Sequence, residues 1–215
     1  KDIYGEKKLP QLLHRLCAIP GIYWIRILYC YPEEITDELI ETIKTEPKVC
    51  HYLDMPIQHA SDRILKQMGR RTDQAELRER IGRLREEIPD ICLRTTLISG
   101  FPGETQEDHI ELYNFVDELE FDRLGVFTYS QEEGTPAARM ENQVPQEVKE
   151  DRQAELMELQ QEIAFEKAEN MKGKTLIAMI EGRVDGENAY VARTYRTPPM
   201  WTDCCCQYLK RTVDG

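Results

Sequence analysis

Residues 91–105, ICLRTTLISGFPGET, decide the fold of this chain. The first nine are mostly apolar or β-branched, a composition that predicts a buried strand. The glycines and proline of GFPGET then predict a tight turn, and Thr105 with Asp108 resembles a capping box that starts a helix. A strand, a turn and a helix in this order form the repeating unit of a parallel α/β sheet.

The same alternation extends from this stretch in both directions. Apolar positions at helical spacing predict helices within 9–17, 35–43, 72–88 and 105–119, and apolar runs predict strands within 22–31, 49–57, 91–99 and 123–130. The run 22–31, IYWIRILYCY, is expected to be buried on both sides because it is almost wholly apolar. The fold class is therefore α/β: a parallel sheet or part of a barrel, since four strands are too few to close one.

The character of the chain changes after Gly134. A long acidic helix is predicted, followed by two strands in 175–196 that a turn at Asp185-Gly186 joins. We expect a partial α/β barrel at 1–140, a linker helix at 141–173, an incomplete β domain at 174–196 and an atypical tail at 197–215.

Charge and hydropathy limit the possible functions. The formal net charge of −12 argues against broad binding to a nucleic-acid backbone and favours a basic protein partner. The sequence shows no membrane span and no signal peptide, so a cytoplasmic location is expected, without a membrane partner. The opening KDIYGEKKLP resembles the end of a strand and its loop, and we expect further sequence upstream.

The cysteines give no metal-site pattern. Cys17, Cys30, Cys50 and Cys92 stand far apart beside apolar residues and are interpreted as small buried side chains. The run 204–206 consists of three adjacent cysteines, which cannot all face one metal from regular backbone. We therefore predict no metal site in this chain and interpret 197–215 as disordered, truncated or out of frame.

Ligand-binding residues in parallel α/β folds gather where the strands end. Four polar loops meet this condition: 31–32, 55–61, 99–105 and 129–135. The GFPGET turn can either offer free N–H groups to an anionic ligand or be a sharp turn that needs two glycines. His59 can serve as acid, base or donor, or simply cap its loop.

Two arginines lie inside apolar strands, where an unpaired charge is unfavourable. Arg26 and Arg94 each need either a ligand or an ion pair with an acidic residue, and Arg94 is the better ligand candidate because its strand leads into GFPGET. No catalytic triad, zinc-protease motif or phosphate-binding loop is found, so the catalytic residues stay unknown. The residues alone predict a ligand-binding α/β fold.

Longer motifs carry a resemblance. MPIQHASDRILKQMGRRT at 55–72, LRTTLISGFPGET at 93–105, FDRLGVFTYSQEEGTPAARM at 121–140 and QVPQEVKEDRQAELMELQQEI at 143–163 closely resemble the methylthiotransferase branch of the radical-SAM enzymes. MPIQHAS resembles the RimO type more than the tRNA-modifying members. That type adds a methylthio group to the β-carbon of an aspartate of small-subunit ribosomal protein twelve. The resemblance implies a partial radical-SAM barrel followed by a TRAM-like β-barrel, of which 174–196 would be a truncated part.

The resemblance also implies cofactors and site residues. The parent enzyme would use S-adenosylmethionine and two [4Fe-4S] clusters, whose cysteine ligands are absent here, so this isolated chain is expected to be inactive. The residues that match cofactor-facing positions are Gln58, His59, Arg94, Gly100, Gly103, Glu104 and Tyr129.

Partners and rivals follow from the same resemblance. Ribosomal protein twelve or the small ribosomal subunit would be the partner, with RNA contact possible through the TRAM-like segment. The alternatives are a tRNA (adenosine) methylthiotransferase of the same branch and a non-enzymatic module that docks on the ribosome. After about Arg196 the stretch PPMWTDCCC departs from the family, and we attribute it to a frameshift or assembly error.

Overall fold

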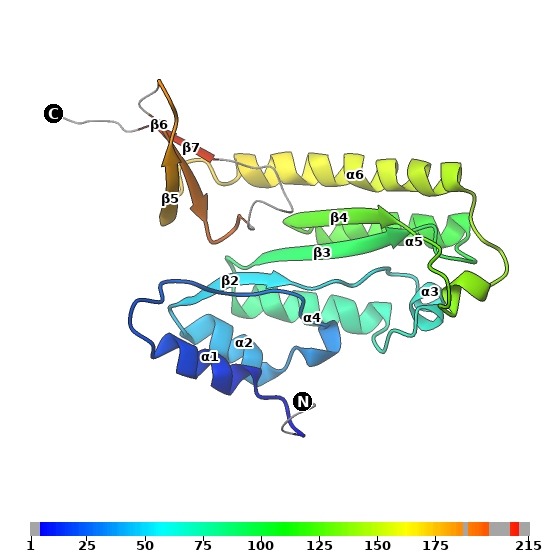
Figure 1. Ribbon diagram of the computed structural model, residues 1–215, viewed down its shortest axis with the longest axis horizontal. Coiled ribbons are helices and arrows are strands. Elements are labelled where there is room, and N and C mark those ends of the chain that lie inside the picture. Colours follow the sequence, from blue (N-terminus) through cyan, green and yellow to red (C-terminus); the bar gives the residue numbers. More distant parts are fainter. Residues whose placement is uncertain (1–4, 187–188, 198–206, 211–215) are drawn as a thin grey trace.

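Two sheets and one long helix organise the chain in the computed structural model, which describes residues 5–186, 189–197 and 207–210 (Figure 1). The first sheet is parallel and has the order β1-β2-β3-β4. Its strands are β1 (Ile25–Ile27), β2 (Val49–Asp54), β3 (Cys92–Ser99) and β4 (Arg123–Thr128). The second is antiparallel and contains β5 (Ala178–Arg183), β6 (Ala189–Thr194) and β7 (Gln207–Lys210).

Helices alternate with the parallel strands. They are α1 (Leu9–Cys17), α2 (Asp37–Thr45), α3 (Asp62–Gln67), α4 (Gln74–Glu87), α5 (Gln106–Leu119) and α6 (Gln146–Glu169). Short 3-10 turns occupy Pro32–Glu34 and Ala137–Arg139. None of the helices in the described ranges has the length and apolarity that crossing a membrane requires.

Local caps explain where these helices begin. The Thr36 side chain accepts a hydrogen bond from the Leu39 N–H, and Asp73 and Thr105 each form a complete capping box. The capping box predicted at Thr105 and Asp108 is confirmed. The sequence analysis did not anticipate α3, a helix of less than two turns that follows the loop containing His59.

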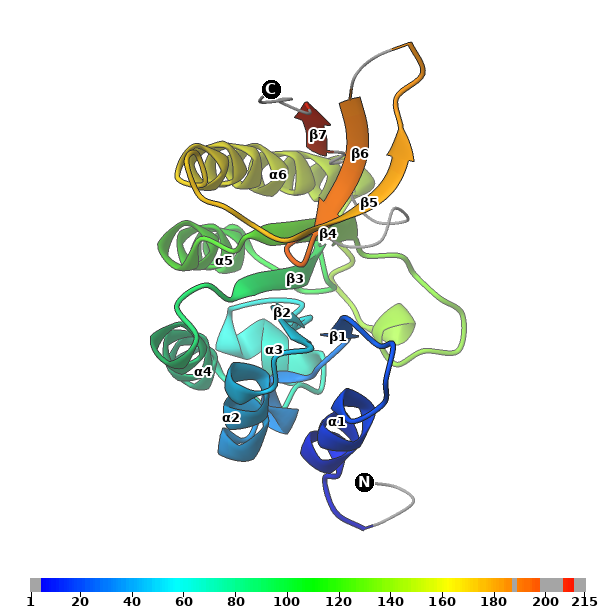
Figure 2. The same ribbon diagram turned by 90° about the vertical axis from the view of Figure 1, so that its left-hand side faces the viewer.

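The helices pack on one face of the parallel sheet. Successive neighbouring strands joined by right-handed crossovers place their helices on the same side, and Figure 2 shows α2, α4 and α5 there. Leu53, Leu97 and Phe115 are among the side chains buried between the two layers. Full burial of such a side chain contributes about 1.5–3 kcal/mol each. In the part of the chain that the structure describes, no helix layer covers the other face of the sheet (Figure 2).

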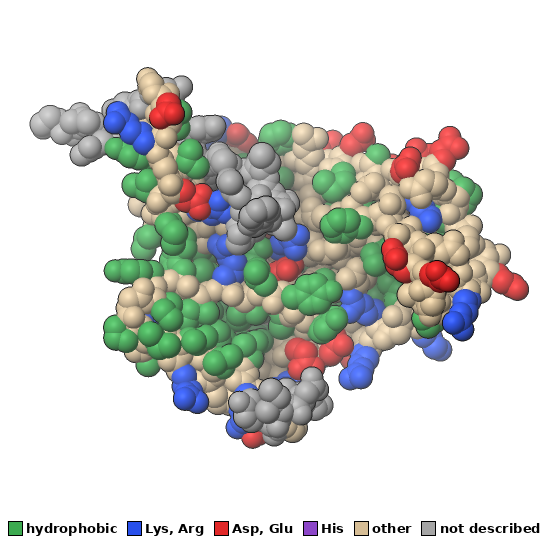
Figure 3. Space-filling view, in the orientation of Figure 1, with side chains coloured by type: hydrophobic (Ala, Val, Ile, Leu, Met, Phe, Trp, Pro, Cys, Tyr) green, Lys and Arg blue, Asp and Glu red, His purple; other side chains and the backbone are tan. Residues whose placement is uncertain are grey.

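The prediction for 22–31 is wrong in one respect. Only Ile25–Ile27 form a strand, and the following Leu28 and Tyr29 are 53% and 62% exposed. The reason is that β1 is the edge strand of the described sheet and pairs only with β2. Figure 3 shows hydrophobic side chains gathered on the visible face around β1 and α1. The almost wholly apolar run therefore indicated a strand, but it did not indicate a neighbouring strand on each side.

Helix α6 connects the two sheets and also packs against the first. Leu156, Leu159 and Ile163 are buried, and the Gln160 side chain donates a hydrogen bond to the Phe121 carbonyl. Strand β7 lies within the segment that the sequence analysis assigns to the atypical tail, and it pairs with β6. Residues 198–206, including the three adjacent cysteines, lie outside the described residues. The proposed domain boundaries remain a prediction.

The turn after β6 joins the second sheet to the amino end of the parallel sheet. The Tyr195 carbonyl accepts a 2.7 Å hydrogen bond from Arg26, whose guanidinium lies 4.7 Å from the centre of the Tyr52 ring. Arg196 forms a 2.5 Å ion pair with Asp122. Among the described residues Arg26 therefore meets backbone carbonyls and an aromatic face, whereas an ion pair with an acidic residue was expected; contact with a ligand stays a prediction.

This junction predicts how the buried Cys92 thiol will react. Cys92 is 1% exposed and packs with Tyr195, and burial raises the pKa of its thiol to about 12. The Tyr195→Ala variant should open this junction more often, so that a thiol reagent modifies Cys92 ~10-fold faster or more. A tenfold rise corresponds to lowering the free energy of local opening by about 1.4 kcal/mol. Peptide mapping by mass spectrometry would follow Cys92 separately from the other cysteines. Tyr23→Ala, which removes an 81% exposed ring, is the control; equal rates in both variants would contradict the prediction.

Candidate functional site

The carboxyl ends of the four parallel strands form one edge. The Tyr29 N–H donates to the Asp54 carboxylate, Gln58 forms a bridge with Leu97, and the Tyr129 N–H donates to the Ser99 carbonyl at 2.8 Å. The strand-end loops predicted from the sequence therefore meet along this edge. Both Tyr29 and Gln58 have positive φ, 61° and 71°, which is unusual for residues with a side chain.

The GFPGET turn binds a carboxylate from its own sequence. The Glu104 Oε2 atom accepts hydrogen bonds from the N–H groups of Gly100 (2.8 Å) and Phe101 (3.1 Å). Its Oε1 atom accepts one from Arg152 of α6 at 2.8 Å. The interpretation of this turn as a free anion cradle is therefore wrong, because the glutamate three or four residues later in the chain occupies the two N–H groups.

His59 lies beside this carboxylate and is fully buried. Its Nδ1 accepts a hydrogen bond from the Ser61 N–H at 2.9 Å, which leaves the ring proton of the neutral side chain on Nε2. Nε2 lies 3.6 Å from Glu104 Oε2 and has no hydrogen-bond partner among the described residues. The Ser61 contact agrees with the loop-capping interpretation of His59, and contact of Nε2 with a ligand stays a prediction.

These contacts predict a loss of stability in acid. Burial alone would raise the pKa of Glu104, but His59, the charge of Arg152 and the Phe101 N–H together hold it below its usual 4.5. At Asp108, burial alone would likewise raise the pKa, but hydrogen bonds from Arg63, Thr105 and Ser61 lower it. Their stabilisation is fully present above the unfolded-state pKa and is lost as the pH falls through the folded-state pKa, because the unfolded chain then binds more protons.

Urea unfolding across a series of pH values would measure this effect. The free energy of unfolding should fall below about pH 4.5, and it should fall less steeply in Glu104→Gln and Asp108→Asn. An unchanged slope in both variants would show that other groups cause the acid sensitivity.

Arg94 has an acidic partner. Its Nη1 lies 2.8 Å from Asp54 Oδ1, and the other oxygen of Asp54 accepts the Tyr29 N–H. Of the two interpretations of Arg94, the structure shows the ion pair; contact with a ligand through its other nitrogens stays a prediction. Asp54, which was not predicted as a site residue, lies at the end of β2 and connects Tyr29, just after β1, with Arg94 near the start of β3. An acidic residue at the end of an apolar strand was the signal available for it.

Lysine 149 also went unnoticed in the sequence. It is 7% exposed, its Nζ donates to the Tyr129 carbonyl at 2.9 Å, and its stem lies against Gly100. Gly100 has a φ of +72°. The Tyr129 ring packs edge-on against Phe101 at 5.5 Å, and its hydroxyl has no partner among the described residues. Tyr129 thus presents an unsatisfied polar atom close to the strand ends.

Gly103 borders a separate opening. Its N–H donates to the Asn142 carbonyl at 2.9 Å, and its carbonyl accepts a 2.7 Å hydrogen bond from Arg63. The opening that Gly103 lines with Arg63 and Gln67 has a volume of about 610 Å³. Gly103, like Gly100 and Glu104, therefore shapes the turn with its own backbone.

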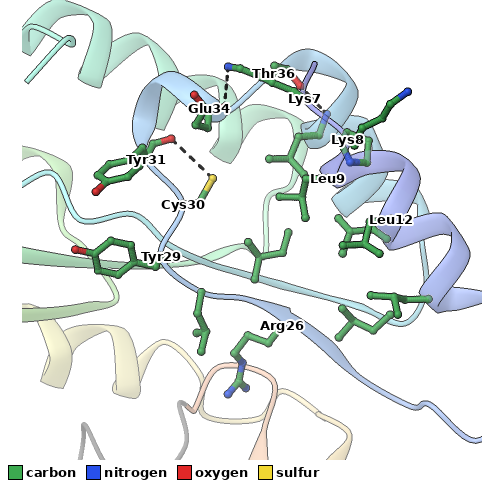
Figure 4. A pocket seen from close by; sticks show the side chains of 17 residues that line it. Lys7, Lys8, Leu9, Leu12, Arg26, Tyr29, Cys30, Tyr31, Glu34 and Thr36 are labelled. Carbon is green, nitrogen blue, oxygen red and sulfur yellow. Dashed lines mark hydrogen bonds and ion pairs between the residues drawn. The ribbon is translucent and has the colours of Figure 1, made fainter. Parts of the chain in front are cut away.

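Another cavity lies away from the predicted site residues. It measures about 440 Å³ and lies between α1 and β1, lined by apolar side chains such as Leu13, Leu16 and Ile27 (Figure 4). None of the seven predicted site residues lines it. Figure 4 shows the rings of Tyr29 and Tyr31 pointing to the same side, at the strand end. Tyr29 and Tyr31 also line this cavity. We place the candidate site at the strand ends because the seven predicted site residues lie outside the cavity lining.

The fit to the implied cofactors differs between them. The edge offers an unsatisfied hydroxyl at Tyr129 and the strained Gln58, which suit a small polar ligand such as S-adenosylmethionine. An iron–sulfur cluster needs cysteine thiolates. Among the described residues no three Cys, His, Asp or Glu side chains gather as metal ligands, and burial raises the pKa of Cys30 to about 11. The described cysteines do not fit a cluster.

Comparisons with known proteins agree with this architecture. The profile of the radical SAM superfamily matches residues 4–116. The protein named ribosomal protein uS12 methylthiotransferase RimO from Lachnoclostridium phytofermentans is 62% identical over 198 residues, which are 92% of this chain and 45% of that protein. The protein of the same name from Geobacter sulfurreducens is 54% identical over 182 residues, which are 85% and 41% of the two chains.

The chain thus spans less than half the length of these curated relatives. Among solved structures, coproporphyrinogen III oxidase (HemN) from Escherichia coli, described as a radical SAM enzyme, is similar with a TM-score of 0.50. The sequence identity is 24%, and the similarity covers 67% of this chain and 32% of HemN. That similarity supports the fold alone.

Proposed function

This chain belongs to the radical SAM superfamily, and from this premise we propose that it forms part of a methylthiotransferase acting on ribosomal protein uS12 in the cytoplasm. The reaction would add a methylthio group to the β-carbon of an aspartate. One observation carries the proposal: 62% identity over 198 residues to a protein named for this activity. The strained strand ends and the unsatisfied Tyr129 hydroxyl support a ligand at the same edge.

The proposal includes S-adenosylmethionine and two [4Fe-4S] clusters. When bound, this set would supply the radical and the sulfur for the transfer. Gln58 and Tyr129 would contact S-adenosylmethionine, and Arg94 would add a charge that Asp54 keeps in place. His59, Gly100, Gly103 and Glu104 would act as positioning residues for the turn, since their described contacts are to protein groups. The described residues alone would not complete the clusters, so the 215-residue chain is expected to be inactive.

The second sheet is proposed as part of a TRAM-like domain. Three antiparallel strands follow α6, and the outer strand β5 is largely exposed, with Met179 and Ile180 at 50% and 61%. This surface would bind the small ribosomal subunit and could contact its RNA. The acidic charge of the whole chain suits a basic ribosomal protein.

A transfer assay tests the proposal. The protein is prepared at the full length of its curated relatives, reconstituted anaerobically with iron and sulfide, and given S-adenosylmethionine with either uS12 or tRNA. Mass spectrometry should find the methylthio group on an aspartate of uS12. Modification of tRNA instead would favour the tRNA-modifying branch. Binding to the ribosome with neither product modified would favour a docking module, and the 215-residue chain is the inactive control.

A further inference from the structure

An aromatic pair with an adjacent arginine lies where β1 ends. The rings of Tyr29 and Tyr31 meet edge-to-face with their centres 5.7 Å apart, and they are 62% and 39% exposed. The guanidinium of Arg70, which follows α3 in the chain, lies 5.2 Å from the centre of the Tyr31 ring. Tyrosine and arginine in such clusters are the residue types that contribute most to recognition of peptides and proteins.

The backbone holds Tyr29 in an unfavourable conformation. A residue with a side chain in the left-handed region costs roughly 1–2 kcal/mol, and Tyr29 has a φ of 61°. Two hydrogen bonds to Asp54 maintain this conformation. The Tyr29 N–H donates to the Asp54 carboxylate at 3.3 Å, and the Cys30 N–H donates to the Asp54 carbonyl at 2.8 Å. Strain of this kind concentrates at functional sites. Here it places an exposed ring at the strand end.

Arg70 differs from the other arginines along this edge. Arg63, Arg94 and Arg152 are each paired with a carboxylate. Arg70 donates to the Pro56 carbonyl at 3.2 Å, and no ion pair to it is found within the described ranges. A guanidinium has five N–H donors, so most of those on Arg70 stay available for a carboxylate from another molecule.

We propose that Tyr29, Tyr31 and Arg70 form a docking patch for a peptide segment that carries an aspartate. This inference deepens the proposed function and rests on it: the segment would be the loop of uS12 that carries the modified aspartate. Arg70 pairs with the carboxylate of that aspartate, and the two tyrosine rings pack against the neighbouring peptide. The patch adjoins Asp54 and Arg94, so the bound aspartate lies beside the edge at which Gln58 and Tyr129 follow β2 and β4.

Peptide binding tests the patch without requiring catalysis. A fluorescent synthetic peptide of the uS12 loop is titrated with the full-length protein, and its anisotropy is measured. Tyr29→Ala and Arg70→Ala should each weaken binding about tenfold, the loss typical of a recognition residue. Tyr23→Ala and Arg71→Ala are matched controls, since the first ring lies beyond the other end of β1 and the second side chain is the exposed neighbour of Arg70. Both controls should bind within about twofold of the unchanged protein, as surface substitutions outside an interface do.

A second peptide with asparagine in place of the aspartate isolates the charge. Arg70→Ala should weaken binding of the aspartate peptide about tenfold but of the asparagine peptide less than about twofold, because the pair is then already broken. Equal losses for the two peptides would remove the assigned role of Arg70.

Tyr29→Gly separates recognition from folding. Glycine adopts positive φ without the steric penalty, so the thermal midpoint should stay the same or rise while peptide binding weakens. Unchanged binding in Tyr29→Gly and Tyr29→Ala, or no binding of the aspartate peptide to the unchanged protein, would overturn the patch. The transfer assay on uS12 judges the proposed function independently of either result.

Discussion

Replacing Glu104 with glutamine should destabilise the chain by about 3–5 kcal/mol, the usual effect of removing one member of a buried ion pair. The Glu104 side chain is fully buried and that of Arg152 is 8% exposed. The variant leaves the Arg152 charge without its carboxylate partner. It also weakens the hydrogen bonds that the Gly100 and Phe101 N–H groups donate to residue 104. The free energy of unfolding in urea is the measurement.

Glu158→Gln provides the matched control. Glu158 lies on the exposed side of α6, so its substitution should change the free energy of unfolding by less than about 0.5 kcal/mol. A third variant, Glu104→Gln with Arg152→Met, tests the coupling. It should be less destabilised than the sum of the two single variants, because the methionine removes the unpaired charge. Additive losses would mean that the two side chains act independently.

Gly100→Ala is the second substitution with a large expected effect. A side chain at its φ of +72° costs roughly 1–2 kcal/mol. The added Cβ would also overlap the Lys149 stem, with Lys149 Cβ at 3.0 Å and Cγ closer still. Forcing an extra carbon into packed surroundings costs about 1–3 kcal/mol, so the total expected loss is about 2–5 kcal/mol.

Two other glycines separate the contributions. Gly134 has a φ of +83° but open space around it, so Gly134→Ala should cost only the backbone part, about 1–2 kcal/mol. Gly82 lies inside α4 with open space, and Gly82→Ala should stabilise the chain by about 0.5–1 kcal/mol. If Gly100→Ala and Gly134→Ala cost the same, close packing of Lys149 contributes nothing.

Both substitutions concern the turn that leads from β3 into α5. Glu104 fixes the turn from inside, and Lys149 from α6 covers it while its amine bonds to the Tyr129 carbonyl. The carboxyl ends of β3 and β4 are thus held by side chains of a helix that begins well after both strands. This arrangement explains why α6 contributes to the candidate site although none of its residues was predicted to do so.

The sequence by itself determined the four parallel strands, most of the helices between them, and their order. The helix starts at Thr36, Asp73 and Thr105 depend on side chains three residues from the N–H groups they bind, so a short stretch contains all the information. The parallel arrangement of the first sheet also followed, because right-handed crossovers leave few alternatives. The superfamily was likewise evident in the long motifs.

Only the tertiary structure decided which groups the buried charges meet. Glu104 and Arg152 are 48 residues apart, and Arg26 and the Tyr195 carbonyl are 169 apart. From the sequence, many groups could pair with these arginines. Only the packing of α6 and of the second sheet decides which group each arginine meets. The exposure of Tyr29 depends on the edge position of β1, which no local pattern records. Hydrogen bonds between neighbours are encoded locally, whereas partners of buried charges are fixed by the fold as a whole.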